Sequence, residues 1–191
     1  MNRASATCAL ALSIAVLSGC GTTDSDSESA TSSAESTTRV PRLTDDSERP
    51  PVAFDPCLDI PDEILSGAGY DPSSKKVSDY PMGDYTFLGC DFKTPVRQYG
   101  LSFLSSNISF AEEEQKTAAY AQPITVNGRR ALLEVQETNR ETCAISLETS
   151  YGILIVIRNL HHNEIGIAPQ EQWCAGLEDT VRQIEPLLPK D

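Results

Sequence analysis

The sequence predicts an α+β domain in which an antiparallel sheet of about five strands carries an N-terminal and a C-terminal helix. Three observations lead to this class: runs of alternating apolar residues with an Asn-Gly turn, an apolar stripe of helical spacing near the C-terminus, and an even set of cysteines. The part of the chain rich enough in apolar residues to fold runs from residue 51 to residue 191, about 140 residues. This length is typical of a single domain.

A short helix is predicted at the start of the domain. Residues 61–63, Pro-Asp-Glu, suit the first turn of a helix, because proline is tolerated there and acidic side chains favour the positive end of the helix dipole. Gly67 ends it. Residues 70–84 are polar and interrupted by glycine and proline, which predicts a connection without regular structure.

The predicted sheet occupies the middle of the chain. Apolar residues alternate over residues 85–92, 99–103 and 143–147, and Asn127-Gly128 between two apolar runs indicates a hairpin. Residues 152–157 are apolar on both faces, which is typical of a central strand covered on both sides.

Two further helices are predicted around and after the sheet. Residues 110–116 form a short acidic helix or turn capped by Ser109, with charges that we interpret as solvated. One helix opening at Pro169 is predicted at the C-terminus and should end near Pro186. Its apolar stripe is formed by Trp173, Leu177, Val181, Ile184 and Leu188.

Residues 17–20, Leu-Ser-Gly-Cys, have the form of a bacterial lipoprotein processing site. An apolar run of about nine residues precedes them, too short to span a bilayer, for which a helix needs ~20 residues. We therefore expect a signal peptide over residues 1–19 and lipidation of Cys20 by acyl chains such as palmitate. Two or more chains give stable attachment to the extracytoplasmic face of the cell membrane.

Residues 20–50 are rich in serine, threonine and acidic residues and poor in large apolar ones. Such a segment cannot bury enough apolar area to offset its ordering entropy, so it is predicted to be a disordered tether. Its serines and threonines leave O-glycosylation open.

Four cysteines belong to the predicted domain: Cys57, Cys90, Cys143 and Cys174. In an exported protein an even set indicates two disulfides. Four cysteines allow three connectivities, of which Cys57–Cys90 with Cys143–Cys174 is favoured because it ties each terminal helix to a nearby strand. The spacings of 33, 53 and 31 residues are unlike those of a structural zinc site.

The net charge of -13 argues against binding to nucleic acid, whose phosphates require lysine and arginine. The acidic tether, residues 55–57 (Asp-Pro-Cys), residues 126–129 (Val-Asn-Gly-Arg), and residues 173–174 (Trp-Cys) together resemble a family of actinobacterial cell-envelope lipoproteins whose shared domain is of unknown function. The resemblance covers residues 54–188. It implies a surface lipoprotein with two disulfides and gives no catalytic residues.

Catalytic and metal-binding patterns are scarce, and no cofactor is predicted. The two histidines, His161 and His162, are adjacent, so on a strand they would point to opposite faces and would need another ligand such as Glu164 to hold a metal. The favoured function is a non-catalytic binding module for an envelope lipid, glycan or protein partner. The alternative is an envelope hydrolase that uses His161 or His162.

Overall fold

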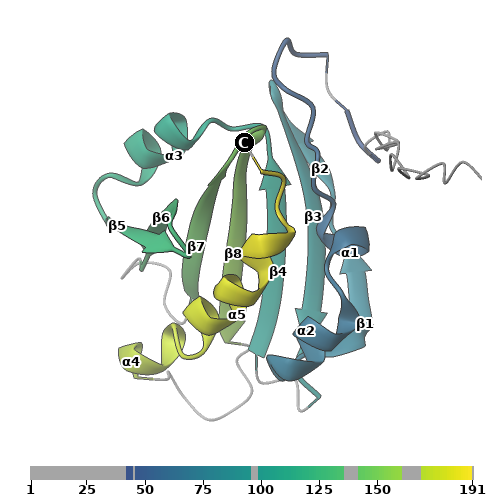
Figure 1. The fold of residues 1–191 in the computed structure, drawn as a ribbon, viewed down its shortest axis with the longest axis vertical. Coiled ribbons are helices and arrows are strands. Elements are labelled where there is room, and N and C mark those ends of the chain that lie inside the picture. The colour runs from purple at the N-terminus through teal and green to yellow at the C-terminus, as the bar shows by residue number, and fades with distance from the viewer. Residues whose placement is uncertain (1–41, 45, 96–98, 136–141, 161–168, 191) are drawn as a thin grey trace, which may run out of the picture. The chain divides into compact units, whose positions relative to one another are not determined.

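An antiparallel sheet dominates the fold (Figure 1). The computed structural model describes residues 42–44, 46–95, 99–135, 142–160 and 169–190. Over these residues the sheet has eight strands: β1 (Asp71–Val77), β2 (Tyr80–Met82), β3 (Tyr85–Lys93), β4 (Tyr99–Ser106), β5 (Ala121–Val126), β6 (Arg129–Glu134), β7 (Thr142–Thr149) and β8 (Gly152–Leu160). The strand order is β1-β3-β4-β8-β7-β6-β5, and β2 also pairs with β3.

The expectation of about five strands was wrong, because β1 and β2 lie in the segment that was predicted to be an irregular connection. β1 has the sequence Asp-Pro-Ser-Ser-Lys-Lys-Val, and none of its residues is buried. All three residues of β2 are exposed. A strand whose two faces are both largely exposed to solvent needs no alternation of apolar and polar residues. These two strands therefore have no period-two signal in the sequence.

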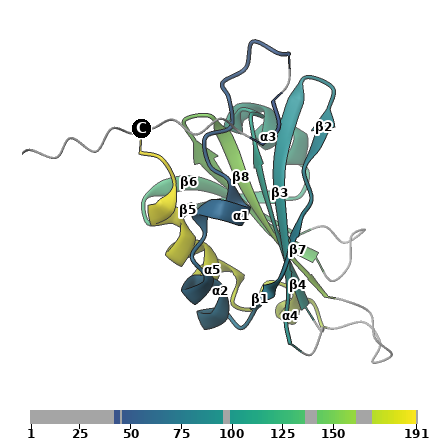
Figure 2. The same ribbon diagram turned by 90° about the vertical axis from the view of Figure 1, so that its right-hand side faces the viewer.

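The larger core lies between the sheet and the terminal helices. α1 (Pro56–Asp59), α2 (Asp62–Gly67) and α5 (Leu177–Ile184) lie on the same side of the sheet, as Figure 2 shows. Four side chains in register across neighbouring strands meet them in this core: Cys90, Phe103, Val156 and Ile145. We call this side of the sheet the helix face.

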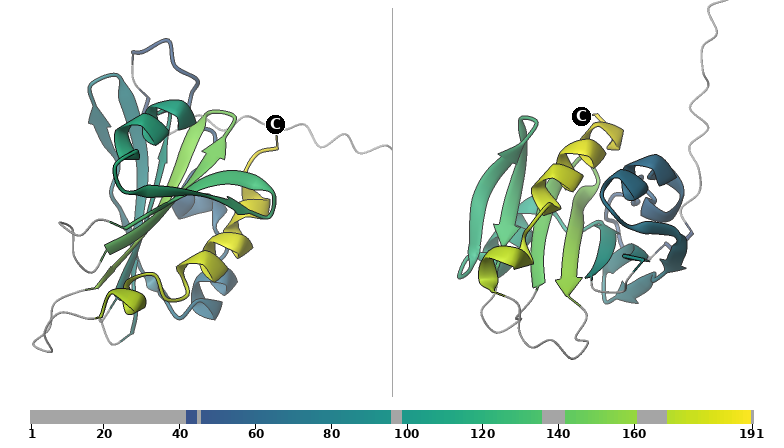
Figure 3. Two further views of the ribbon diagram at one scale, coloured as in Figure 1. Left: turned by 90° about the vertical axis from the view of Figure 1, so that its left-hand side faces the viewer. Right: turned by 90° about the horizontal axis from the view of Figure 1, so that it is seen from below.

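The opposite side of the sheet carries α3 (Phe110–Thr117) and a second, smaller cluster of buried apolar side chains (Figure 3). Phe87, Ile153 and Ile155 belong to this cluster, and Phe110 of α3 packs with them. We call this side the α3 face. β8 therefore buries side chains on both faces, which confirms its prediction as the central strand.

The C-terminal segment is not one continuous helix. α4 (Gln170–Trp173) ends just before Cys174, and α5 begins at Leu177 after Gly176, whose φ of 74° is left-handed. The break follows from Gly176, because a residue in the left-handed region cannot continue an α-helix. The predicted apolar stripe is nevertheless buried along its whole length. α5 ends at Ile184, and residues 185–187, which include Pro186, form the short 3-10 turn η1.

Both predicted disulfides are present. Cys57 of α1 is bonded to Cys90 of β3, and Cys143 of β7 is bonded to Cys174 directly after α4. Each bond joins a helical segment on the helix face to a strand beneath it. This confirms the connectivity that the sequence favoured.

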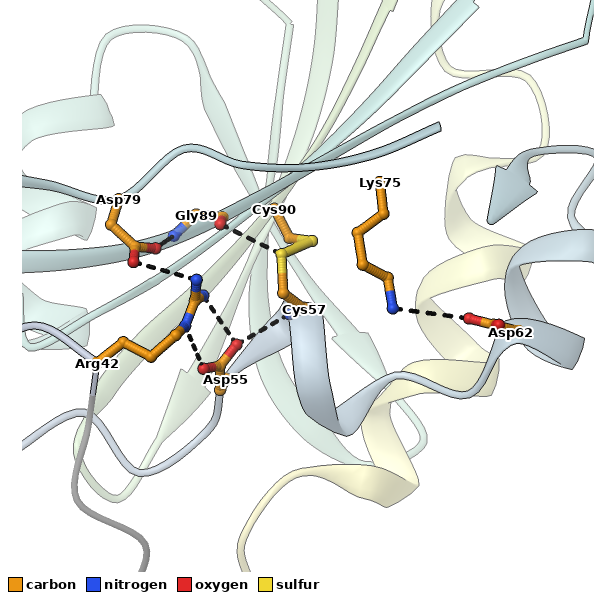
Figure 4. Close-up of a disulfide and its surroundings, with 8 residues drawn as sticks. All are labelled: Arg42, Asp55, Cys57, Asp62, Lys75, Asp79, Gly89 and Cys90. Atoms are coloured by element: carbon orange, nitrogen blue, oxygen red, sulfur yellow. Dashed lines mark hydrogen bonds and ion pairs between the residues drawn. A yellow bond between two sulfur atoms is a disulfide. The ribbon is translucent and has the colours of Figure 1, made fainter. Parts of the chain in front are cut away.

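Residues that the sequence assigned to the tether contact the domain. Arg42 donates to both carboxylate oxygens of Asp55 (2.5 and 2.9 Å) and lies 3.2 Å from a carboxylate oxygen of Asp79 (Figure 4). Asp55 is the N-cap of α1, and its side chain also accepts a hydrogen bond from the backbone N–H of Cys57. Leu43 packs against the core of the helix face. The folded domain thus includes Arg42, ahead of the expected boundary at Pro51.

Candidate functional site

A groove lies on the α3 face of the sheet. It has a volume of about 360 Å³, near the lower end of the roughly 300–1,000 Å³ that small-molecule sites occupy. Its floor is made of apolar side chains from four adjacent strands: Phe87, Leu104, Ala144, Ile155 and Ile157. The sheet places them together because they alternate with the residues that point into the larger core.

β2 supplies one rim of the groove. The ring of Tyr80 stacks on Phe87 with its centroid 4.6 Å away, and Met82 lies beside it. Large apolar side chains are usually covered, yet 39% of Tyr80 and 52% of Met82 are exposed. The rim therefore presents apolar surface to the groove and to solvent at the same time.

α3 forms the opposite wall, and its position is fixed at its first turn. Ser109 and Glu112 form a reciprocal capping box, and Phe110 is buried in the cluster beneath the helix. Arg130 of β6 lies over the Phe110 ring, 4.5 Å from its centroid. One helical turn further on, Glu113 and Lys116 reach the groove.

Glu113 is 1% exposed, which is rare for a carboxylate and requires a partner. The ammonium of Lys116 supplies it, with contacts of 3.1 and 2.9 Å to the two carboxylate oxygens. Burial opposes the charge of Lys116, but its hydrogen bond to Glu113 and the negative charges of Glu113 and Glu134 outweigh this and raise its pKa. The prediction that the charges of this helix are simply solvated is therefore wrong for Glu113.

Glu134 is the third charged group of the groove, and it comes from β6. Its carboxylate accepts a hydrogen bond of 2.5 Å from the hydroxyl of Ser146 on β7. Burial raises the pKa of Glu134, the Ser146 hydroxyl partly offsets this, and the neighbouring charge of Glu113 raises the pKa further. The carboxylates of Glu113 and Glu134 thus both lie near a single ammonium group, that of Lys116.

This arrangement is suited to binding. Small-molecule sites are usually lined by apolar and aromatic side chains with a few polar groups, and the groove has this composition. Within the described ranges, no group of three or more histidine, cysteine or acidic side chains could hold a metal ion. The groove is distinguished from the other hollows of similar volume, such as one of about 370 Å³ beside Phe110 and Arg130, by its buried carboxylate and by the breadth of its apolar floor.

The groove residues were missed at the sequence level. Glu134 stands at the end of the apolar run Ala-Leu-Leu of β6, and an acidic residue in such a run was a usable signal. Tyr80 and Met82 gave no signal, because their strand was not predicted. Cys20, which is predicted to be lipidated, and the histidines His161 and His162 lie outside the described residues, so lipidation and the hydrolase alternative remain predictions.

In the part of the chain that the structure describes, no helix is long and apolar enough to cross a bilayer.

Comparison with known proteins shows that residues 15–187 match a family described as "Protein of unknown function (DUF3558)". No curated protein and no solved structure matches the chain. Because the match extends over most of the sequence, the chain belongs to the DUF3558 family of proteins of unknown function.

Proposed function

We propose that this protein is an actinobacterial cell-envelope lipoprotein whose domain is a non-catalytic binding module. It is held on the extracytoplasmic face of the cell membrane by acyl chains on Cys20. The processing motif at residues 17–20 and the polar, acidic segment behind it support the anchoring. Two disulfides in one small domain support export, since such bonds persist in oxidising compartments.

The groove on the α3 face is the observation that carries the binding function. Its floor exposes part of Leu104 and Ile157, and the rim adds the exposed side chains of Tyr80 and Met82. A small apolar molecule, or one arm of a larger one, would bury this surface. Each Å² of apolar surface removed from water contributes roughly 25 cal/mol.

The anchoring is tested with the full-length chain in an actinobacterial host fed an alkyne-tagged fatty acid. The wild type should carry the tag, and Cys20→Ser should not. Cys8→Ser is the matched control, because the proposed cleavage removes Cys8 with the signal peptide. Retention of the tag by Cys20→Ser would refute the assignment of the lipidation site.

The binding function is tested by native mass spectrometry of the protein taken from its own membrane. Wild type should retain a bound small molecule, and Ala144→Phe, which places a ring on the groove floor, should release it. Ala175→Phe is the control, since Ala175 is exposed on the segment between α4 and α5. An equal bound mass in all three proteins would place the ligand elsewhere and overturn the assignment of the groove.

A further inference from the structure

The charged groups of the groove do not balance. Glu113 and Glu134 each carry one negative charge when ionised, and Lys116 carries one positive charge, so the set has a net charge of -1. Lys116 is hydrogen-bonded to Glu113, whereas the described hydrogen bond to Glu134 comes from the neutral hydroxyl of Ser146. The carboxylate of Glu134 is therefore the polar group of the groove that gains most from a cation.

The apolar floor begins next to this carboxylate. Ala144 is the register partner of Glu134 on β7, and Ile157 is the partner of Ala144 on β8. Across the sheet from there, the floor continues over Leu104 to Phe87, which Tyr80 covers. A ligand lying along the groove would meet an acidic end and an apolar end.

We propose that the groove binds a cationic amphiphile, whose protonated amine donates to the carboxylate of Glu134 while its apolar chain lies over Ile157 and Leu104 and reaches Tyr80. The proposal rests on the binding function assigned to the groove above and specifies the class of ligand. The bound amine would bring the local set to two positive and two negative charges. It would also stabilise the ionised form of Glu134, which burial and Glu113 disfavour.

An anionic amphiphile fits the groove less well. Lys116 is the cation that lines the groove, and two of the three N–H groups of its ammonium face Glu113. An anionic head group would therefore compete for the positive charge that stabilises a carboxylate only 1% exposed. The head group of such a ligand would also lie close to the negative charge of Glu134.

The experiment compares three probes with the same ten-carbon chain: decylammonium, decyl sulfate and decyl maltoside, each below its micelle concentration. The protein is the full-length chain carrying Cys20→Ser, so that its own acyl chains cannot compete. Titration calorimetry should give decylammonium roughly tenfold or more tighter binding than the other two, as expected of one charge-assisted hydrogen bond. Glu134→Gln should abolish this preference and leave decyl maltoside binding unchanged.

A control is needed because any cation is attracted to a chain of net charge -13. Glu63→Gln changes the net charge by the same amount at an exposed position of α2, on the helix face. It should keep the full preference for decylammonium. Ser146→Ala leaves the Glu134 carboxyl group in place while removing the same hydrogen bond. A preference for decylammonium that survives in Ser146→Ala would show that Glu134→Gln acts through the carboxyl group and not through a folding defect.

The outcomes separate the two proposals. If all three probes bind equally and Glu134→Gln changes nothing, the cationic class is wrong although the groove still binds apolar chains. If Glu63→Gln weakens decylammonium as much as Glu134→Gln does, the preference comes from net charge and the class is again wrong. If no probe binds, or if Ala144→Phe leaves all binding intact, the binding function of the groove itself fails.

Discussion

Cys143 and Arg158 lie opposite each other on the adjacent strands β7 and β8, and both side chains hold the segment in which α4 ends. Cys143 is bonded to Cys174, while Arg158 donates to the carbonyl oxygens of Gln172 (2.7 Å) and Trp173 (2.9 Å). The guanidinium also lies 3.8 Å from the centre of the Tyr99 ring. A buried charge is thus stabilised by the carbonyls at a helix end and by an aromatic face.

Removing both attachments together should lower the free energy of unfolding by less than the sum of the two separate effects. Breaking the disulfide with Cys143→Ala and Cys174→Ala should lower the free energy of unfolding by about 3–4 kcal/mol, from the chain entropy of its loop. Arg158→Met should lower it by about 2–3 kcal/mol, since two carbonyls lose a charged donor. Because both hold one segment, we expect a coupling of at least about 0.5 kcal/mol in a denaturant-based double-mutant cycle.

The other disulfide provides the control for this cycle. Cys57 and Cys90 lie on α1 and β3, away from α4, so replacing both by alanine should add to Arg158→Met without coupling. Equal coupling in both cycles would show that the effect is global and does not arise from the shared segment.

Gly152 should not accept a side chain. Its φ is 147°, and a Cβ at this position would lie 2.3 Å from the carbonyl oxygen of Ser106 and 2.6 Å from that of Ile108. Gly152→Ala should therefore lower the free energy of unfolding by at least about 2 kcal/mol. Gly67→Ala in α2, where a Cβ meets nothing within 4 Å, should change it by less than about 1 kcal/mol. Similar melting temperatures for the two variants would contradict the prediction.

Glu134 should make the domain less stable as the pH rises. The pKa of its carboxyl is raised in the folded protein by burial and by Glu113, against the opposing effects of Ser146 and Lys116. The folded state therefore binds the proton more tightly than the unfolded state, whose glutamate pKa is about 4.3, and stability falls as the pH rises from that value through the folded pKa. Glu134→Gln, which cannot ionise, should melt at a higher temperature than wild type near neutral pH.

The same comparison near the unfolded pKa is the internal control for Glu134. The difference in melting temperature between Glu134→Gln and wild type should shrink as the pH is lowered towards about 4, where both folded proteins are neutral at this position. The groups that face Glu134, namely Glu113, Lys116 and Ser146, are unchanged in the variant. A variant that melts below wild type near neutral pH, but at the same temperature as wild type near pH 4, would show that the charge of Glu134 stabilises the fold.

Arg49 and Glu112 should contribute stability that acid removes. Arg49 donates to both carboxylate oxygens of Glu112 (2.8 and 2.7 Å), and these bonds, with those from Ser109, hold the pKa of Glu112 well below its usual range. A lowered carboxyl pKa stabilises the fold above the unfolded pKa and loses this effect as the pH falls through the folded pKa.

The variant Arg49→Gln tests this contribution. Its free energy of unfolding at neutral pH should be below that of wild type by about 1 kcal/mol or less, because 37% of the Glu112 side chain is exposed. The two proteins should converge as the pH is lowered below about 4. Arg182→Gln, which removes the exposed pair with Glu178 in α5, should be nearly neutral throughout. A difference for Arg49→Gln that persists in acid would point to packing on Tyr85, 4.3 Å from the guanidinium.

The sequence was most informative where burial or turn geometry dictates the type of residue. The hairpin turn was predicted from Asn127-Gly128, the central strand β8 from an apolar run that buries both faces, and the stripe of α5 from its period of 3.6 residues. The disulfide pairing followed because each terminal helix had one cysteine and a strand with another near it in the chain.

The groove could be predicted only in part. Ile155 and Ile157 were expected to be covered on both sides of the sheet, and nothing in the periodicity shows that the cover over Ile157 is incomplete. Glu113 looks like any other acid of the run at residues 112–114, since its burial depends on where β6 and β7 place the sheet beneath α3. Such facts depend on tertiary packing and have no local signature.

The attachment of Arg42 determines where a mechanical load would enter the domain. If the chain is anchored at Cys20 as proposed, the first of the described residues that a pull between membrane and ligand would load is Arg42, which holds Asp55 and Asp79 with one guanidinium. Asp79 in turn accepts a hydrogen bond from the backbone N–H of Gly89 on β3. Behind these contacts the covalent bond between Cys57 and Cys90 prevents α1 from being peeled off the sheet. Rupture under force would therefore release the segment ahead of α1 and stop at the disulfide, and the release of Arg49 with that segment would remove the partner of Glu112 at the start of α3.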